Sequence, residues 1–534
     1  MKYIVLNPIR LVVGLIVLGS LSLNAKGNID GETVVNTKCI ACHTDVSSNK
    51  LTRISEQRKT PEGWFMTITR MQSANGLAIT EEEKMAAVKY LSDTQGITPN
   101  ESKKYRYILE QQPNIQETSH DTLLTEMCVR CHSAARVGLQ RRSTQEWNKL
   151  IDFHLGHFPT IEYHALSRDR DWLNIAKDEV VPYLGKEFNL EKKEWNKWAK
   201  QFPNRNIDGS WVITGHTLGA GDFIANLKLE KLANDNFNVE INGKYLDGRP
   251  LKGKGNAILY SGYELRTSLT INDIEFKQVL AISKDNKSLK GRMFETLHPE
   301  EGSSIEGLYT KDVSSKILNS FPKSIKKDSK AILTIVGNNL NGKISLPKGI
   351  KVKKVLERTN NKIVLDVYST ATAQSLNGDI KVGSSVRKNA LAVYDKVDNI
   401  KVFPQYAIAR VGDGGGKMPK QHAIFEAYGF NAGKDNKIGT ADDIPLGVVN
   451  ASWRIEAFNE IAKHDEDVKY VGTIDTYSGR FTPSFAGPNP KRKFSTNNAG
   501  NIKVIATYKD ENKEIQADSH LIVTVQKWVN PPIN

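Results

Sequence analysis

Cysteine is rare in this sequence. Its 534 residues contain only four cysteines. All four lie in two pentads of the CxxCH pattern, which read Cys39-Ile-Ala-Cys42-His43 and Cys128-Val-Arg-Cys131-His132. No cysteine is left over outside the pentads, so whatever chemistry the thiols serve must be explained by these two motifs.

The two pentads predict covalently bound haem. CxxC pairs also occur in zinc sites and in redox disulfides. Zinc sites of this kind usually keep their pairs about 15 to 20 residues apart, whereas most of a small domain separates Cys42 from Cys128. Each pair is also followed directly by a histidine. We therefore predict two haems c, each held by thioethers from its cysteine pair, with His43 and His132 as the proximal iron ligands.

Several features of other functional classes are missing. The sequence has no basic helix and no basic patch interleaved with aromatic residues, so nucleic-acid binding is not expected. It has no Ser/His/Asp order and no histidine cluster at metal-ligand spacing that would support hydrolysis. The formal charge of +14 is spread over a chain with 60 acidic residues. Such a balance is typical of a solvated basic surface, which can steer an acidic redox partner.

The N-terminus has the order of a secretory signal. Lys2 and Arg10 precede an apolar run from Leu11 to Leu23, and Asn24-Ala25 follows. The run is too short for an ordinary membrane span. Residues 1–25 are therefore predicted to be a signal peptide cleaved near Ala25, with an uncleaved anchor as the alternative. We expect export to the periplasm, since bacterial cytochromes c mature outside the cytoplasm, and no stable membrane anchor.

The stretch from Lys26 to about Phe188 is rich in helical patterns and contains a repeat. In each unit a tryptophan is followed by matching positions four and seven residues later, a spacing that lies on one helix face over two turns. The matching residues are Trp64, Ile68 and Met71 in the first unit and Trp147, Ile151 and His154 in the second. The repeat predicts two small cytochrome c folds in tandem, forming an all-α dihaem domain over residues 26–190.

The repeat also selects candidates for the sixth ligand of each iron. A low-spin electron-transfer haem needs a second axial donor, usually a methionine sulfur or an imidazole. Met71 and His154 occupy the same place in their repeats. We expect His43/Met71 ligation in the first site and His132/His154 ligation in the second. The two haems should then differ in potential, because a thioether stabilises reduced iron more than an imidazole does.

Three nearby residues compete for these positions. Met66 is displaced far round the helix from Met71, which disfavours a shared haem-facing side. His157 lies one turn beyond His154 on nearly the same face and remains the alternative ligand for the second iron. His164 is a more distant candidate.

Beyond about Glu191 the pattern changes from helical to short apolar runs separated by Gly, Asn and Asp. Alternating runs of this kind are typical of strands. We expect a multidomain chain in which three all-β domains follow the all-α domain. These are an antiparallel β-barrel or sandwich over residues 191–301, an immunoglobulin-like sandwich over 302–397 and a C-terminal β-sandwich over 398–534, the last with a helix near Ile455 to Lys463. The first alternating runs are Trp211 to Thr214, Phe223 to Leu229, Phe237 to Ile241, Ala257 to Tyr260 and Leu269 to Ile271.

Two loops in the C-terminal region resemble ligand-binding motifs. Gly412 to Lys417 is rich in glycine, but its spacing is wrong for a phosphate loop and Met418 replaces the required Ser or Thr. Asp435 to Asp443 offers several oxygen donors in a glycine turn, as a calcium loop does. A plain acidic turn is the preferred interpretation, and calcium is the less favoured alternative.

A specific family resemblance follows from the order of these features. Two cytochrome-like units with paired TrpX6Met and TrpX6His segments are followed by three β-domains and by a tail containing Gly439-Thr440-Ala441-Asp442-Asp443. This combination resembles the large (alpha) subunit of quinohaemoprotein amine dehydrogenase over essentially the whole mature chain. The resemblance implies a periplasmic heterotrimer that oxidises primary amines to aldehyde and ammonia.

The resemblance also implies a division of labour between chains. In that family the amine reacts at a cysteine tryptophylquinone on a small subunit, a β-propeller subunit forms the other wall, and the dihaem subunit carries electrons away. All four cysteines here are assigned to haem, so the quinone is expected on a partner chain and no catalytic residue on this one. Electrons are expected to pass through both haems to a soluble acceptor such as a cupredoxin or a small cytochrome c.

Two other functions stay open at this point. The chain could be a stand-alone periplasmic dihaem electron carrier whose β-domains bind a surface, a polymer or another enzyme. It could also be a dihaem peroxidase, which needs one haem with an open or displaceable sixth position. The presence of a candidate distal ligand in both repeats disfavours the peroxidase.

Overall fold

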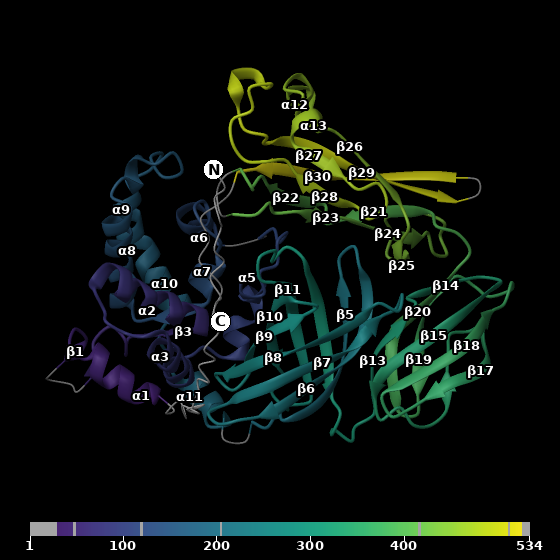
Figure 1. The fold of residues 1–534 in the computed structure, drawn as a ribbon, viewed down its shortest axis with the longest axis horizontal. Coiled ribbons are helices and arrows are strands. Elements are labelled where there is room, and N and C mark those ends of the chain that lie inside the picture. The colour runs from purple at the N-terminus through teal and green to yellow at the C-terminus, as the bar shows by residue number, and fades with distance from the viewer. Residues whose placement is uncertain are drawn as a thin grey trace, which may run out of the picture.

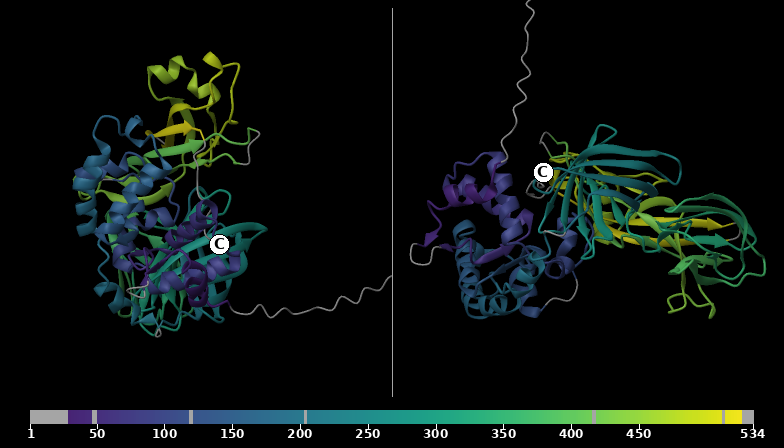
Figure 2. Two further views of the ribbon diagram at one scale, coloured as in Figure 1. Left: turned by 90° about the vertical axis from the view of Figure 1, so that its left-hand side faces the viewer. Right: turned by 90° about the horizontal axis from the view of Figure 1, so that it is seen from below.

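The structure is a computed structural model that describes residues 29–45, 50–117, 121–202, 205–414, 418–510 and 513–525. The predicted signal peptide, residues 1–25, lies outside the described residues. Four parts follow one another along the chain: a helical part over residues 29–199, a closed barrel, a two-sheet sandwich part and a C-terminal part. The helical part and the sandwich part lie on opposite sides of the barrel (Figures 1 and 2).

The helical part has three helices of 14 or 15 residues, α2 (Pro61–Asn75), α3 (Glu81–Thr94) and α8 (Thr144–His157). The remaining helical segments are short, and three of them, η1, η3 and η5, are π-helical turns that continue an α-helix. The short segments are α1 (Gly31–Val34), η1 (Val35–Cys39), α4 (Pro99–Ser102), η2 (Lys103–Tyr105), α5 (Arg106–Leu109), α6 (Thr122–Leu124), η3 (Thr125–Val129), α7 (Ala135–Gly138), η4 (Ile161–Tyr163), α9 (Trp172–Ile175), η5 (Ala176–Val180), α10 (Val181–Glu187) and α11 (Lys193–Ala199).

The expectation of an all-α tandem cytochrome domain is wrong. The chain as a whole is mostly β, and the helical part itself contains strands. β1 (Thr44–Asp45) pairs with β2 (Lys50–Leu51), and β3 (Gln57–Lys59) pairs with β4 (Gln140–Arg142). β3 and β4 each end just before the extended N-cap of a long helix, so the backbone there is already in strand conformation and available for pairing.

The barrel is closed by eight antiparallel strands in the order β10-β11-β12-β5-β6-β7-β8-β9. Alternate side chains of each strand point inward, as Phe223, Ala225, Leu227 and Leu229 of β6 do, and together they fill the core. The last strand lies beyond the expected end of this domain at residue 301. The strands are β5 (Gly209–Thr217), β6 (Gly221–Lys231), β7 (Asn236–Tyr245), β8 (Pro250–Tyr260), β9 (Glu264–Ile271), β10 (Ile274–Ile282), β11 (Ser288–Glu295) and β12 (Gly302–Tyr309).

Buried ion pairs join the helical part to the barrel wall. Glu264 of β9, only 1% exposed, binds the guanidinium groups of Arg106 and Arg266. Arg266 also donates to Glu62 at the start of α2, at 2.6 Å. Because unpaired charges are costly in such a buried position, this network fixes the helical part against β9.

The sandwich part consists of two four-stranded sheets, β13-β15-β18-β17 and β14-β20-β19-β16, which enclose one apolar core. Strands of the two sheets alternate partly along the chain, so neither sheet is a simple meander. The strands are β13 (Lys316–Phe321), β14 (Ser324–Lys326), β15 (Ser329–Asn338), β16 (Ile344–Ser345), β17 (Ile350–Arg358), β18 (Lys362–Ser369), β19 (Leu376–Val382) and β20 (Ser385–Tyr394).

The C-terminal part is also built of sheets, and it lies above the barrel in Figure 1. The helix expected near Ile455 to Lys463 is displaced, because strand β26 occupies the first third of that range and α12 begins only after the N-cap Asn459. The elements are β21 (Asn399–Phe403), β22 (Tyr406–Arg410), β23 (Ala423–Ile424), β24 (Glu426–Asn431), β25 (Ile444–Val449), β26 (Ser452–Ala457), α12 (Glu460–His464), α13 (Asp467–Tyr470), β27 (Gly472–Ile474), β28 (Arg480–Pro483), η7 (Lys493–Ser495), β29 (Gly500–Asp510) and β30 (Lys513–Thr524).

Among the helices of the described residues, none is both long and apolar enough to cross a bilayer.

Candidate haem-binding site

The first CxxCH pentad forms a tight turn at the end of η1. The carbonyl oxygen of Cys39 accepts hydrogen bonds from the backbone N–H of Cys42 at 3.2 Å and of His43 at 3.0 Å. Cys39 is half-buried, Cys42 is exposed, and neither forms a disulfide. The turn therefore keeps both thiols free and brings them to the same short segment as the histidine, as two thioether bonds to one porphyrin require.

The imidazole of His43 is held by the backbone. Its Nδ1 lies 3.1 Å from the carbonyl oxygen of Thr52, a bond in which the ring nitrogen donates. This contact fixes the ring tautomer and leaves Nε2 as the atom for iron. Burial lowers the pKa of His43, which favours the neutral imidazole that a metal needs. The donor set at this position thus fits a haem c.

The second pentad repeats this geometry at the end of η3. The Cys128 carbonyl accepts from the N–H groups of Cys131 at 3.3 Å and His132 at 3.4 Å. His132 Nδ1 lies 3.0 Å from the Ser133 carbonyl oxygen, and burial lowers the pKa of His132. Cys131 is exposed and unbridged like its counterpart, while burial raises the pKa of Cys128 to about 12. The residues of this pentad also fit a haem c.

The two long helices beside the pentads are equivalent in their anchoring. The indole N–H of Trp64 on α2 donates to the Gln95 carbonyl at 3.1 Å, and that of Trp147 on α8 donates to the Phe188 carbonyl at 3.2 Å. Both tryptophans are buried. Each bond joins its helix to the end of the unit's later helix, so the internal repeat of the sequence is a repeat of three-dimensional contacts.

Met71, the predicted sixth ligand of the first iron, lies in the last turns of α2. Its side chain is half-buried, and the Asn75 amide nitrogen lies 3.7 Å from its sulfur. Met66, the competitor, is half-buried on the same helix. The contact and the burial of these side chains do not identify an iron ligand, so the choice of Met71 stays a prediction.

His154, the predicted sixth ligand of the second iron, differs clearly from its competitors. It is half-buried, and its Nδ1 lies 2.7 Å from the Leu150 carbonyl oxygen, which again leaves Nε2 for a metal. Burial lowers the pKa of His154. His157 is exposed with its ring 4.1 Å from that of Phe153, and His164 is exposed as well. The assignment to His154 stays a prediction, and its environment resembles that of the two proximal histidines.

A buried group of charges lies between the two units. Glu146 of α8 is fully buried and binds Arg53 at 3.2 Å and Lys149 at 3.0 Å, with Arg142 at 3.6 Å. Lys59 of β3 donates to a threonine hydroxyl at 2.7 Å, and burial holds its pKa well below the usual value. These side chains come from both units, so the charges fix the units relative to each other.

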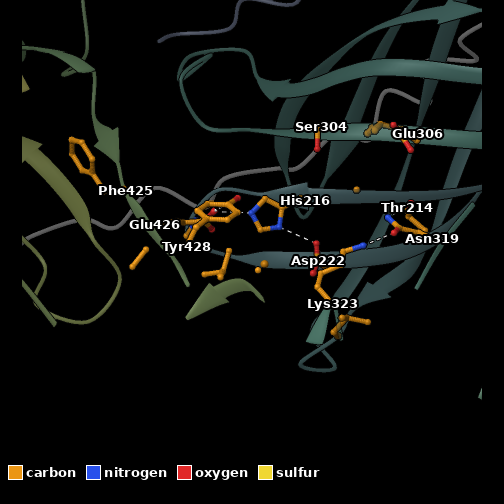
Figure 3. Close-up of a pocket in the computed structure, with 18 of the residues that line it drawn as sticks. Thr214, His216, Asp222, Ser304, Glu306, Asn319, Lys323, Phe425, Glu426 and Tyr428 are labelled. Atoms are coloured by element: carbon orange, nitrogen blue, oxygen red, sulfur yellow. Dashed lines mark hydrogen bonds and ion pairs between the residues drawn. The ribbon is translucent and has the colours of Figure 1, made fainter. Parts of the chain in front are cut away.

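A cavity of about 1110 Å³ lies where the barrel, the sandwich part and the C-terminal part meet, and residues between Lys103 and Gln112 of the helical part also line it. Figure 3 shows His216 of β5 between two carboxylates: its Nδ1 is 2.9 Å from Asp222 and its Nε2 is 2.8 Å from Glu426. Burial acts to lower the pKa of His216, but the hydrogen bonds to Asp222 and Glu426 raise it to about 10. Burial lowers the pKa of Lys323 to about 8. The sequence gives no indication of this group, because His216 and Glu426 lie in different parts of the chain.

Residues 415–417 of the glycine-rich loop lie outside the described residues. In the acidic loop, Asp442 accepts from the N–H groups of Lys434 at 2.7 Å and Asp435 at 3.2 Å, and Asp443 accepts from Gly439 at 2.9 Å. These carboxylates cap the turn itself, as in an acidic Asx-type turn.

Comparison with protein families covers all four parts. Four family models match: "Quinohemoprotein amine dehydrogenase A, alpha subunit, haem binding" over residues 29–195, and the models for alpha subunit domains II, III and IV over residues 204–309, 314–395 and 400–533. No curated protein matches. Among solved structures, a redesigned β-barrel is 14% identical, covering 20% of this chain and 92% of its own, with a TM-score of 0.18. Drosophila N-cadherin EC1-4 is 9% identical, covering 60% and 93%, with a TM-score of 0.15.

Proposed function

The chain belongs to the family of quinohaemoprotein amine dehydrogenase alpha subunits, and from this membership we propose that it is the dihaem electron-transfer subunit of such an enzyme. In this proposal a cysteine tryptophylquinone on a partner chain oxidises the primary amine. Electrons then pass through two haems c on this chain to a soluble acceptor. The observation that carries the proposal is the match of the haem-binding family model over a region that contains two CxxCH turns of the same geometry.

The residues of this chain have two tasks in that function. Haem c, when bound, takes up and releases one electron at a time. Cys39, Cys42, Cys128 and Cys131 attach the porphyrins, and the backbone carbonyls beside His43 and His132 orient the imidazoles. Buried tryptophans hold the helices of each unit together, and the ion pair of Arg53 with the buried Glu146 joins one unit to the other.

The proposed partners follow from the assignment of every cysteine of this chain to haem. A cysteine tryptophylquinone needs a cysteine, and all four cysteines lie in the pentads. The proposal therefore places the quinone on a small partner subunit, with a β-propeller subunit completing a heterotrimer. It places the complex in the periplasm, with a cupredoxin or a small cytochrome c as acceptor. Membership in a family whose alpha subunit works with other subunits supports a multisubunit complex.

One purification tests this function. The native protein should co-purify with a small chain that stains for a quinone and with a propeller-sized chain, and a primary amine should reduce its haems. Haem absorption should bleach or shift only when amine is added, and a tertiary amine of similar size serves as control. A chain that runs alone, with no quinone staining and no amine-dependent haem reduction, would rule the proposal out in favour of a free carrier or a peroxidase.

A further inference from the structure

Two histidines and two glutamates converge where the barrel meets the C-terminal part. Three of them, His298, Glu300 and Glu301, lie in the loop between β11 and β12, and His422 lies just before β23. Each offers one ligand atom, and all four atoms lie within 4.8 Å of one another. In Figure 1 this end of the barrel lies below β22 and β23. The group therefore belongs to the junction between two parts, and none of its four members comes from the helical part.

The spacing of these atoms is that of metal ligands. His298 Nδ1 is 3.1 Å from Glu300 Oε1, and the same oxygen is 3.5 Å from His422 Nδ1. His422 Nδ1 is in turn 2.9 Å from Glu301 Oε1. Four ligands bound tetrahedrally at about 2.0 to 2.2 Å lie roughly 3.3 to 3.6 Å apart. Only small side-chain movements separate the present arrangement from such a site.

A carboxylate oxygen and a guanidinium nitrogen both lie close to His422 Nδ1. Besides Glu301 Oε1, which can only accept, this nitrogen lies 3.1 Å from a guanidinium nitrogen of Arg480, which can only donate. An unprotonated Nδ1 faces the carboxylate oxygen with its lone pair, and a protonated one faces another N–H group. A metal ion shared by Nδ1 and the carboxylate takes the place of the proton between them, and Arg480 Nη2 also donates to Glu301 Oε1. Arg480 keeps its bond from Nη1 to the other oxygen of Glu301, at 2.7 Å.

We propose that His298, Glu300, Glu301 and His422 bind a divalent metal ion, zinc by the nature of the donors. Imidazole nitrogens and carboxylate oxygens without a thiolate suit zinc and related first-row ions. Four protein ligands leave no open position, which is the arrangement of a structural site. The backbone N–H of His422 donates to Glu300 at 2.9 Å and orients that carboxylate, as outer-shell contacts of metal ligands do. The ion ties the barrel to the C-terminal part.

The site is tested on the purified holoprotein with its partner chains. Elemental analysis should find about one zinc per chain in addition to the haem iron. Treatment with dipicolinate should remove the zinc and lower the thermal midpoint, while the covalently bound haems stay. Calorimetric titration of the treated protein with zinc chloride alone should then show about one site and restore the midpoint.

Two variants connect the zinc to these residues. His422→Ala should lose the zinc at unchanged haem content. His216→Ala is the matched control, because His216 also joins the barrel to a C-terminal carboxylate, at 2.8 Å from Glu426. The control should keep its zinc even if its thermal midpoint falls. The proposal is overturned if the wild-type protein holds no stoichiometric divalent metal and takes none up in the titration, or if His422→Ala keeps the full zinc content. The wild-type measurements decide the question even where a variant fails to fold.

Discussion

Arg58 and Arg141 are direct partners in the short antiparallel ladder between β3 and β4. Arg141 lies 83 residues after Arg58, and the same separation relates Trp147 to Trp64. The two arginines are thus equivalent positions of the two units and also face each other. Pairing of equivalent residues is typical of a local two-fold relation, so the two units of the repeat meet through the same short strand.

One carboxylate binds both of these arginines. Glu101 binds Arg58 through two hydrogen bonds, of 3.0 and 2.7 Å, and lies 3.2 Å from Arg141. Burial acts to raise the pKa of Glu101, but the hydrogen bond and charge of Arg58 and the charge of Arg141 lower it overall. A carboxyl whose pKa is lowered by folding stabilises the fold at pH values above its pKa in the unfolded chain. This contribution is lost as the pH falls through its pKa in the folded protein.

We predict that Glu101→Gln destabilises the helical part. The substitution leaves two buried guanidinium groups facing each other without their shared anion, which should lower the free energy of unfolding by about 3 kcal/mol. Urea denaturation at pH 7, followed by far-ultraviolet circular dichroism, measures this loss. The difference in the free energy of unfolding between this variant and the wild type should decrease when the urea denaturation is repeated at pH 4 and below.

A matched substitution separates this effect from the loss of any glutamate. Glu81 pairs with Lys84 on the same part of the chain, but its side chain is 72% exposed. Glu81→Gln should change the free energy of unfolding by less than about 0.5 kcal/mol. Equal losses for Glu81→Gln and Glu101→Gln would show that the central position of Glu101 has no special role.

The repeat could be found in the sequence because its evidence is local. Trp64 and Trp147 lie a fixed number of residues from their N-caps and from later helix positions, and such spacings can be read directly from the sequence. The pairing of β3 with β4 could not be found in this way. It joins segments far apart in sequence, each only three residues long, and such short stretches have no periodicity to read.

The β region shows the same limit. The run from Phe223 to Leu229 alternates and lies in β6 of the structure. In contrast, closure of the barrel depends on pairing of β12 with β5, across the whole domain. His216 with Glu426, and His298 with His422, are likewise brought together only by the packing of separate parts. Sites of this kind need the three-dimensional structure, because no spacing in the chain connects their members.

The sixth ligand of the first haem gives a second prediction. Met71→Ala should abolish the methionine-to-iron charge-transfer band and lower one of the two midpoint potentials, because the thioether stabilises reduced iron. Absorption spectra and a redox titration of the holoprotein measure both effects. Met66→Ala on the same helix is the control and should change neither. If Met66→Ala removes the band and Met71→Ala does not, the ligand must be reassigned.

The second haem gives a third prediction. His154→Ala should convert that iron towards high spin, since it removes the half-buried imidazole whose Nδ1 is held by the Leu150 carbonyl. Electron paramagnetic resonance of the oxidised protein detects the change. His157→Ala should leave the spectrum as it is, because His157 is exposed and its ring lies against that of Phe153. If only His157→Ala gives a high-spin signal, the sixth ligand is His157, one helical turn after His154.

The pKa of His216 gives a fourth prediction. The folded value of about 10 lies above the unfolded value of about 6.5. The contribution of His216 to stability is therefore fully present below pH 6.5 and is lost as the pH rises through 10. His216→Asn should lower the free energy of unfolding by about 2 to 3 kcal/mol at pH 6.5, since it leaves the carboxylates of Asp222 and Glu426 without their shared cation. Scanning calorimetry across this pH range measures the difference.

The pH trend distinguishes an ion pair from mere loss of packing. The stability difference between the wild type and His216→Asn should decrease steadily from pH 6.5 to 10, because the wild-type imidazole loses its charge over that range. His520 is the matched control: it is half-buried and stacks on Phe458 with ring centres 3.8 Å apart, and burial lowers its pKa. Its imidazole is neutral in both states above pH 7, so His520→Asn should cost a similar amount at every pH up to 10. If the difference in the free energy of unfolding between the wild type and His216→Asn stays constant over the pH range, the imidazole between the two carboxylates is uncharged and contributes no ion pair.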